Sequence, residues 1–154
     1  MKELLLLVHP TLGVLGILAA VWMFVEALNA RAANTRRMFW AASATALCMV
    51  GAWVAGGYWY VTYYAADKAV ILAGALPIAH NFFMEVKEHA FFITLILALL
   101  LPLIAQENDL ATNRSARHLA LWTSGLVILS ALAMEGMGSV IAMGVRIGIT
   151  GSPQ

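Results

Sequence analysis

Three ionisable side chains on three different apolar segments could do chemistry together: His9, His89 and Glu135. A titratable group among hydrophobic residues in a membrane is costly, and it usually serves a function with a partner. Imidazole nitrogens and carboxylate oxygens bind transition metals, and the same groups take up and release protons. The chain therefore carries the residue types of a metal, haem or proton-transfer site, if the fold brings the three segments together.

Long apolar segments must position these side chains. Of the 154 residues, 62% are hydrophobic and 11% are charged, whereas a soluble domain carries about a quarter charged residues. This composition predicts an integral membrane protein. At about 20 apolar residues for each spanning helix, we expect one all-α transmembrane domain, a four-helix bundle. Its predicted spans are residues 10–29, 38–62, 77–106 and 119–147.

Two shorter pieces flank these spans. Residues 67–76 are too few to cross a hydrocarbon core of ~30 Å and are followed by Pro77, so they predict a short interfacial or re-entrant segment that covers one end of the bundle. Residues 3–8, before Pro10, are expected along the membrane surface. The apolar run continues past Trp22, which favours a retained first span over a cleaved leader.

Four spans place both ends of the chain on the same side of the membrane. The first and third connections are rich in arginine: Arg31, Arg36, Arg37, Arg114 and Arg117. Basic connections face the cytoplasm. We therefore expect a multi-pass protein of the bacterial inner membrane with both termini in the periplasm. The formal net charge of +1 gives no nucleic-acid surface.

The candidate side chains are expected at one depth near the outer face. Counting about 1.5 Å per residue from the cytoplasmic ends of the spans places His9, His89 and Glu135 roughly 24–30 Å up. On the third span, Glu85, Glu88 and His89 share one helical face. The sequence thus predicts a polar site in the outer part of the bundle.

Other polar residues have simpler interpretations. His80 is expected at the outer interface, and His118 at the cytoplasmic surface beside an arginine. Glu26, at the inner end of the first span, is expected to pair with an arginine of the first connection. Lys87 either snorkels outward or neutralises a neighbouring glutamate. Cys48 is the single cysteine, so it excludes an internal disulfide and is expected to pack as a small hydrophobe.

Two imidazoles on different helices can ligate a haem iron from its opposite faces. The chain has no C-x-x-C-H motif, so such a haem is of the non-covalent b type. We predict His9 and His89 as the axial pair of one haem b. Small residues would give room for the flat ring, and the predicted ones are Gly13, Gly16, Gly56 and Gly57.

Other functions remain open at this point. A non-haem iron, copper or zinc ion could take a mixed set of oxygen and nitrogen ligands; that set is Glu85, Glu88, His89 and Glu135. The three glutamates could instead relay protons to a quinol site. A purely structural assembly subunit is the fourth interpretation. The sequence holds no hydrolase, P-loop or dinucleotide-binding motif.

Three stretches resemble small bacterial four-helix membrane proteins of the b-type cytochrome kind. They are His9-Pro10, Gly56-Gly57-Tyr58 and the six residues from Met84 to His89. The resemblance implies haem ligation by His9 and His89, and an electron-transfer subunit of an oxidoreductase complex rather than an enzyme by itself. Members of that family carry four histidines for two haems, whereas here His80 and His118 form no second pair, so at most one haem is expected.

The expected partners follow from this interpretation. They are membrane lipids, other membrane or periplasmic redox subunits, and quinone. Stripes of small residues on the first and fourth spans favour close helix packing. Because four spans with polar stripes leave faces to cover, we also expect an oligomer or a larger complex.

Overall fold

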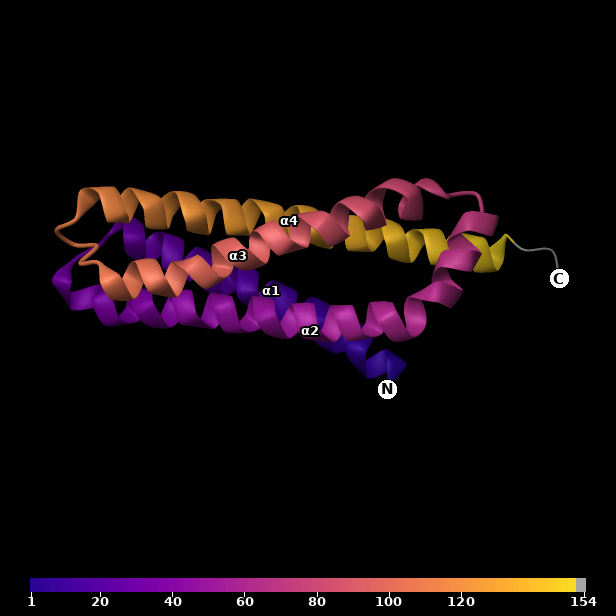
Figure 1. The fold of residues 1–154 in the computed structure, drawn as a ribbon, viewed down its shortest axis with the longest axis horizontal. Helices are drawn as coiled ribbons and strands as arrows, with labels where there is room; N and C mark the ends of the chain where they lie inside the picture. The colour runs from indigo at the N-terminus through magenta and orange to yellow at the C-terminus, as the bar shows by residue number, and fades with distance from the viewer. Residues whose placement is uncertain (152–154) are drawn as a thin grey trace.

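A computed structural model describes residues 1–151 as a bundle of four long helices (Figure 1). The elements are α1 (Lys2–Leu28), the 3-10 turn η1 (Ala32–Asn34), α2 (Thr35–Ala73), the π-helix η2 (Ala79–Met84), α3 (Glu85–Glu107) and α4 (Arg114–Thr150). No strand occurs among the described residues. Four helical segments are long and apolar enough to cross a bilayer. The predicted all-α membrane bundle is confirmed.

The helices occupy four corners. α1 packs against α2 and α4, and α3 packs against the same two helices. Both ends of the described chain point toward the same end of the bundle, on the right of Figure 1, as four spans require. Large apolar side chains such as Leu47, Val61 and Trp122 are exposed, which is the pattern of helices that face lipid rather than water.

The chain before Pro10 differs from the prediction. Residues 3–8 form no separate surface helix, because α1 begins at Lys2 and continues through Pro10. The ammonium of Lys2 pairs with Asp67 of α2 across an N–O distance of 3.1 Å. This ion pair fixes the first turn of α1 along the end of α2.

The second helix is longer than predicted. α2 has 39 residues, or about 58 Å at 1.5 Å per residue, well beyond the ~30 Å hydrocarbon core. Residues 67–73 are therefore its last turns rather than an independent re-entrant piece. Figure 1 shows these turns rising across the end of the bundle toward α4. A Cβ built on Gly74 would lie 2.9 Å from the Cα of Gly148, so glycines allow this close contact.

The π-helix η2 turns the start of the third span. Hydrogen bonds from residue i to i+5 rotate the preceding side chains away from the face that a straight α-helix would give them. His80 is consequently only 4% exposed. The expectation that His80 lies at the outer interface concerns its depth in the membrane, and it stays a prediction.

The hydrophobic core has two parts. The larger cluster includes Ile17, Met49 and Met134, and the smaller one is built around Tyr64, Met84 and Ile141. In α1, α3 and α4, the candidate ionisable residues stand in the sequence between these two clusters or beside them. The fold thus places a polar layer, which holds His9, Lys87 and Glu135 and is termed the polar level below, between two apolar layers.

The turn between α1 and α2 is organised by one buried amide. The Asn34 side chain donates to the Glu26 carboxylate at 2.7 Å and to the Asn29 carbonyl at 3.2 Å, and it accepts from the Arg31 N–H at 2.7 Å. Arg37 pairs with Glu26 at 3.4 Å. The expected pairing of Glu26 with an arginine of the first connection is confirmed.

Replacing Asn34 by alanine leaves these partners unsatisfied in a buried turn. We expect Asn34→Ala to lower the free energy of unfolding by about 1–3 kcal/mol, measured by thermal unfolding in detergent with circular dichroism. Asn29→Ala is the control, because the Asn29 side chain is exposed and its backbone carbonyl stays. Equal losses in both variants would contradict a specific role for the buried amide.

Candidate functional site

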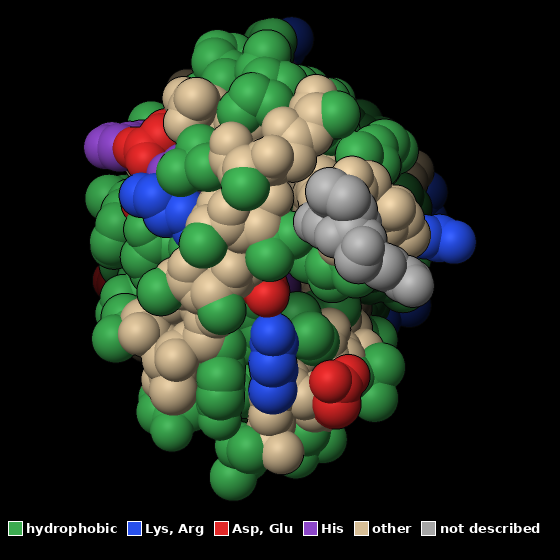
Figure 2. Space-filling view, turned by 90° about the vertical axis from the view of Figure 1, so that its right-hand side faces the viewer, with side chains coloured by type: hydrophobic (Ala, Val, Ile, Leu, Met, Phe, Trp, Pro, Cys, Tyr) green, Lys and Arg blue, Asp and Glu red, His purple; other side chains and the backbone are tan. Residues whose placement is uncertain are grey.

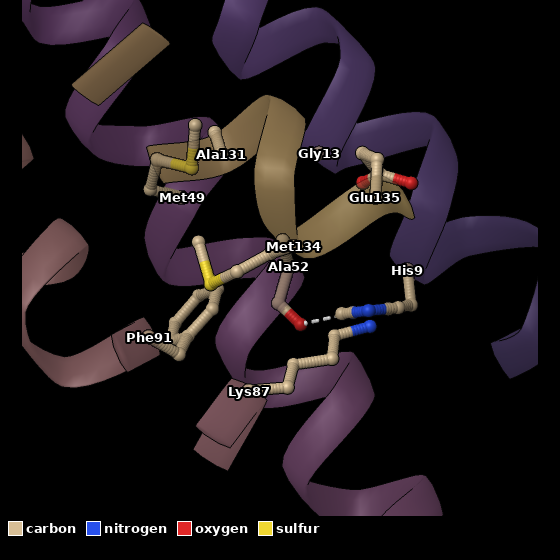
Figure 3. A pocket seen from close by; sticks show the side chains of 9 residues that line it. All are labelled: His9, Gly13, Met49, Ala52, Lys87, Phe91, Ala131, Met134 and Glu135. Atoms are coloured by element: carbon tan, nitrogen blue, oxygen red, sulfur yellow. Dashed lines mark hydrogen bonds between the residues drawn. The ribbon is translucent and has the colours of Figure 1, made fainter. Parts of the chain in front are cut away.

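Three ionisable side chains from three helices meet at the polar level: His9 of α1, Lys87 of α3 and Glu135 of α4 (Figure 3). They line a cavity of about 20 Å³, which is room for one water molecule. Apolar and small residues complete the wall: Gly13, Met49, Ala52, Phe91, Ala131 and Met134. Figure 3 shows the side chains of Lys87 and His9 pointing toward each other.

The orientation of His9 follows from one hydrogen bond. Its Nδ1 lies 2.8 Å from the carbonyl oxygen of Ala52 in α2. A carbonyl only accepts, so Nδ1 carries a proton, and in the neutral ring Nε2 keeps its lone pair. The ring reaches this carbonyl because position 56 is glycine: a Cβ there would lie 2.6 Å from Nδ1. The hydrogen bond to α2 therefore fixes the tautomer of the His9 ring and leaves Nε2 as its basic nitrogen.

The side chains of Glu135 and Lys87 also lie against glycines of neighbouring helices. A Cβ built on Gly13 of α1 would collide with Oε1 of Glu135. A Cβ built on Gly138 of α4 would lie 3.0 Å from the Lys87 nitrogen. Absent side chains on neighbouring helices thus create the space that these charged groups occupy.

Lys87 and Glu135 carry opposite charges, which act on each other and on His9. Among the described residues they form no ion pair within 4.0 Å. With His9 neutral, the three groups sum to zero charge, which lowers the cost of placing them in a membrane. The cavity beside Lys87 and Glu135 has room for one water molecule that hydrogen-bonds to both groups and bridges them.

The cavity adjoins a larger groove of about 680 Å³, which shares His9, Lys87 and Glu135 in its wall. Most of the remaining wall is apolar and includes Trp53 and Phe92, which are also exposed on the surface. The volume falls in the usual range for small-molecule sites of about 300–1,000 Å³. The groove therefore offers a lipid-side entry to the ionisable cluster.

Two polar atoms in the groove wall lack partners. The indole Nε1 of Trp59 and Oε1 of Glu88 are buried without a hydrogen bond in the described chain, and both residues line the groove. An unsatisfied buried group costs about 1–3 kcal/mol. One atom donates and the other accepts, so a ligand that offers both an acceptor oxygen and a hydroxyl donor would satisfy both.

His89 does not join His9. It is exposed, its Nδ1 donates to the Glu85 carbonyl at 2.7 Å, and it lies outside both linings. Residues two positions apart on an α-helix point about 200° apart, so a helix that turns Lys87 inward turns His89 outward. The structure brings Lys87, rather than His89, to His9.

The predicted non-haem ligands are dispersed. Glu85 and His89 are exposed, whereas Glu88 lines the groove and Glu135 lines the cavity. Within residues 1–151, no group of three or more His, Cys, Asp and Glu side chains is arranged to hold a metal ion. The geometry gives the metal interpretation no support.

The four predicted ring-space glycines have different surroundings. Gly13 and Gly56 accommodate Glu135 and His9, as described above. Gly16 packs against Met49, where a Cβ would lie 2.8 Å from its methyl group. Gly57 has open space around it in the described chain and lines the groove beside Gly56.

The two adjacent glycines give a matched test of the site. Gly56→Ala places a methyl group against the His9 ring, so we expect it to break the bond to Ala52 and to lower stability by about 1–3 kcal/mol through overpacking. Nitrogen NMR of labelled histidine should show the loss of the Nδ1-H tautomer. Gly57→Ala meets no atom and should leave the His9 spectrum unchanged. Identical His9 spectra in the two variants would refute this arrangement.

Comparisons of the chain with models of known protein families, with curated proteins and with solved structures give no match. Lys87 is the site residue that sequence reasoning placed least well, because a lysine near a helix end usually snorkels to water. The sequence feature that could have placed Lys87 inside the bundle is Glu135, an opposite charge at a similar depth on another span.

Proposed function

We propose that the chain is a quinone-binding, proton-handling subunit of a redox complex in the bacterial inner membrane. One observation carries this proposal: an acid–base cluster of His9, Lys87 and Glu135 lies at the inner wall of an apolar groove that opens among lipid-facing side chains. Quinones travel in lipid and need both an apolar wall and proton donors. The groove and the cluster supply these two requirements side by side.

The residues suit the chemistry of a quinone head group. A quinone carbonyl can accept a hydrogen bond from the Lys87 ammonium or from the unpaired Trp59 N–H, and a quinol hydroxyl can donate to Glu88. Reduction of the quinone to the quinol takes up two electrons and two protons. The electrons come from a docked redox subunit, which is the partner expected for this chain. The positive charge of Lys87 stabilises negative charge that develops on the quinone oxygen.

The protons need nearby carriers. Neutral His9 offers a free Nε2, and Glu135 lies on the same cavity. Both can exchange protons with the water that the cavity has room to hold. We further propose that both chain termini face the periplasm, in line with the arginine-rich connections, and that the groove opens toward the outer half of the membrane.

Haem b is the function that the sequence favours, and the described groove supports it less well. The wall contributes one imidazole, that of His9, whose Nδ1-H donates to a backbone carbonyl as metal-binding histidines usually do. The second predicted ligand, His89, is exposed outside the groove. A haem held by these two imidazoles therefore draws no support from the geometry.

Photolabelling with a short-tailed azidoquinone tests the proposal on detergent-purified protein. We expect labelled peptides from the groove walls of α2 and α3, with labelling suppressed by excess decylubiquinone. Lys87→Met should weaken the competition about tenfold, or about 1.4 kcal/mol, because a charge-assisted hydrogen bond is lost. Trp59→Phe should weaken it as well, because the indole N–H, which has no hydrogen-bond partner within residues 1–151, is lost.

The control is Lys68→Met, which removes an exposed lysine of α2 that lies outside the groove lining. It should compete as the native chain does. Labelling that decylubiquinone does not suppress, or that falls mainly on peptides outside the groove lining, would refute quinone binding. Sharp reduced-minus-oxidised bands with about one iron per chain would replace the proposal with the haem function.

A further inference from the structure

A second polar cluster lies next to the groove, in the smaller hydrophobic cluster around Tyr64. The hydroxyl of Tyr64 in α2 lies 3.0 Å from Nδ1 of His80 in η2. The other ring nitrogen of His80, Nε2, lies 3.9 Å from Oε1 of Glu85. Tyr64 and His80 are almost fully buried, at 3% and 4% exposure, whereas the side chain of Glu85 is 51% exposed.

Donors and acceptors can be assigned consistently along these contacts. If Tyr64 donates its hydroxyl proton to Nδ1, the ring proton of His80 sits on Nε2, where it faces the carboxylate of Glu85. Two buried groups are thus joined in line to a group at the surface. Figure 2, which views this end of the bundle, shows acidic, basic and histidine side chains in small groups on a surface that is otherwise mostly apolar or uncharged.

The inner end of the cluster reaches the groove. The ring of Tyr60 stacks on Tyr64 with centroids 5.1 Å apart, and the Tyr60 side chain faces the carboxylate of Glu88. Tyr60 and Glu88 both line the groove, and Glu88 carries the unpaired oxygen described above. Within residues 1–151 the two tyrosine hydroxyls share no hydrogen bond, so the stack places them near each other and a water molecule must join them into one polar path.

Other charged groups around this path are accounted for. Asp67 acts on Tyr64 from the next turn of α2, but it is held in an ion pair with Lys2 of α1. Glu85 and Glu88 of α3 are the remaining charges that act on Tyr64. The two glutamates are thus the acid–base ends of the path.

We propose that Glu88, Tyr60, Tyr64, His80 and Glu85 form a proton relay between the groove and the surface of the bundle. A proton enters at Glu88 and passes through the Tyr60 hydroxyl and an intervening water to the Tyr64 hydroxyl. Tyr64 then donates its proton to Nδ1 of His80 while Nε2 releases its own through a second water to Glu85, 3.9 Å away, and the return of the ring to its first tautomer resets the path. No electron moves and no bond is lost overall. The relay deepens the proposed function and rests on it, because groove chemistry that consumes or releases protons needs such a path.

The π-helix is what assembles the relay. An α-helical start of the third span would direct His80 to another face, and the bond to Tyr64 would not form. π-helical turns occur frequently at functional sites. The irregular start of α3 thus has a specific consequence, since it buries an imidazole between a tyrosine and a glutamate.

Stopped-flow infrared spectroscopy after a pH jump tests the relay without quinone. The signal is the carboxyl band of Glu88 in the full chain, assigned by its absence in Glu88→Gln. We expect Tyr64→Phe, which keeps the ring stack, and Glu85→Gln, which changes an exposed residue, each to slow protonation of Glu88 about tenfold or more, or about 1.4 kcal/mol in barrier. The final amplitude should not change.

Tyr63→Phe is the matched control, because Tyr63 precedes Tyr64 on the helix and lies outside the groove lining. It should leave the rate as in the native chain. A native rate in either relay variant, or equal slowing in Tyr63→Phe, would overturn the relay. If Tyr64→Phe fails to fold, Glu85→Gln decides alone. If protonation of Glu88 is slow in the relay variants but no quinone labelling is found, the relay stands and the quinone function is refuted. If the relay variants protonate Glu88 at the native rate and quinone labelling is found, the quinone function stands and the relay is refuted.

Discussion

A lysine ammonium inside a membrane bundle must find compensating charge, and the rest of this structure depends on how Lys87 finds it. Glu135 supplies the opposite charge from another helix, and the His9 ring lies between a backbone carbonyl and the cavity. Translocon-based scales put a single lysine at a helix centre at about 2.5–3.5 kcal/mol, and the cost is smaller for Lys87, which lies in the first turn of α3. Lys87 does not turn out to water but lines the cavity, so the helices must hold the compensating groups in place.

Glycines make this arrangement possible. His9, Lys87 and Glu135 each occupy space that a Cβ on a neighbouring helix would fill. Apolar clusters on both sides of the polar level resist opening of the bundle there. The same small residues bring the cluster within reach of the groove, so one packing solution serves both stability and access for a ligand.

Much of the fold could be predicted from sequence, whereas the contents of the site could not. Hydropathy determines four spans, and the arginine beside Glu26 was foreseeable because a buried carboxylate needs a partner. Counting 1.5 Å per residue also placed His9 and Glu135 at a similar depth. Depth does not determine rotation, however. Whether Lys87 or His89 faces the cavity depends on the rotation of α3, which is set by the π-helix before it. No periodic pattern of hydrophobic residues predicts a π-helix. The length of α2 escaped prediction because its last turns leave the spanning direction and pack on α4 at Gly148.

A double-mutant cycle on Lys87 and Glu135 tests the central claim most directly. Unfolding of Lys87→Met, Glu135→Leu and the double variant would be measured in one detergent. Each single variant strands one buried charge, so both should be strongly destabilised, and the double variant should recover a coupling energy of about 0.5–3 kcal/mol. Effects that add to within about 0.5 kcal/mol would show that the two charges do not depend on each other, and would contradict this account of the site.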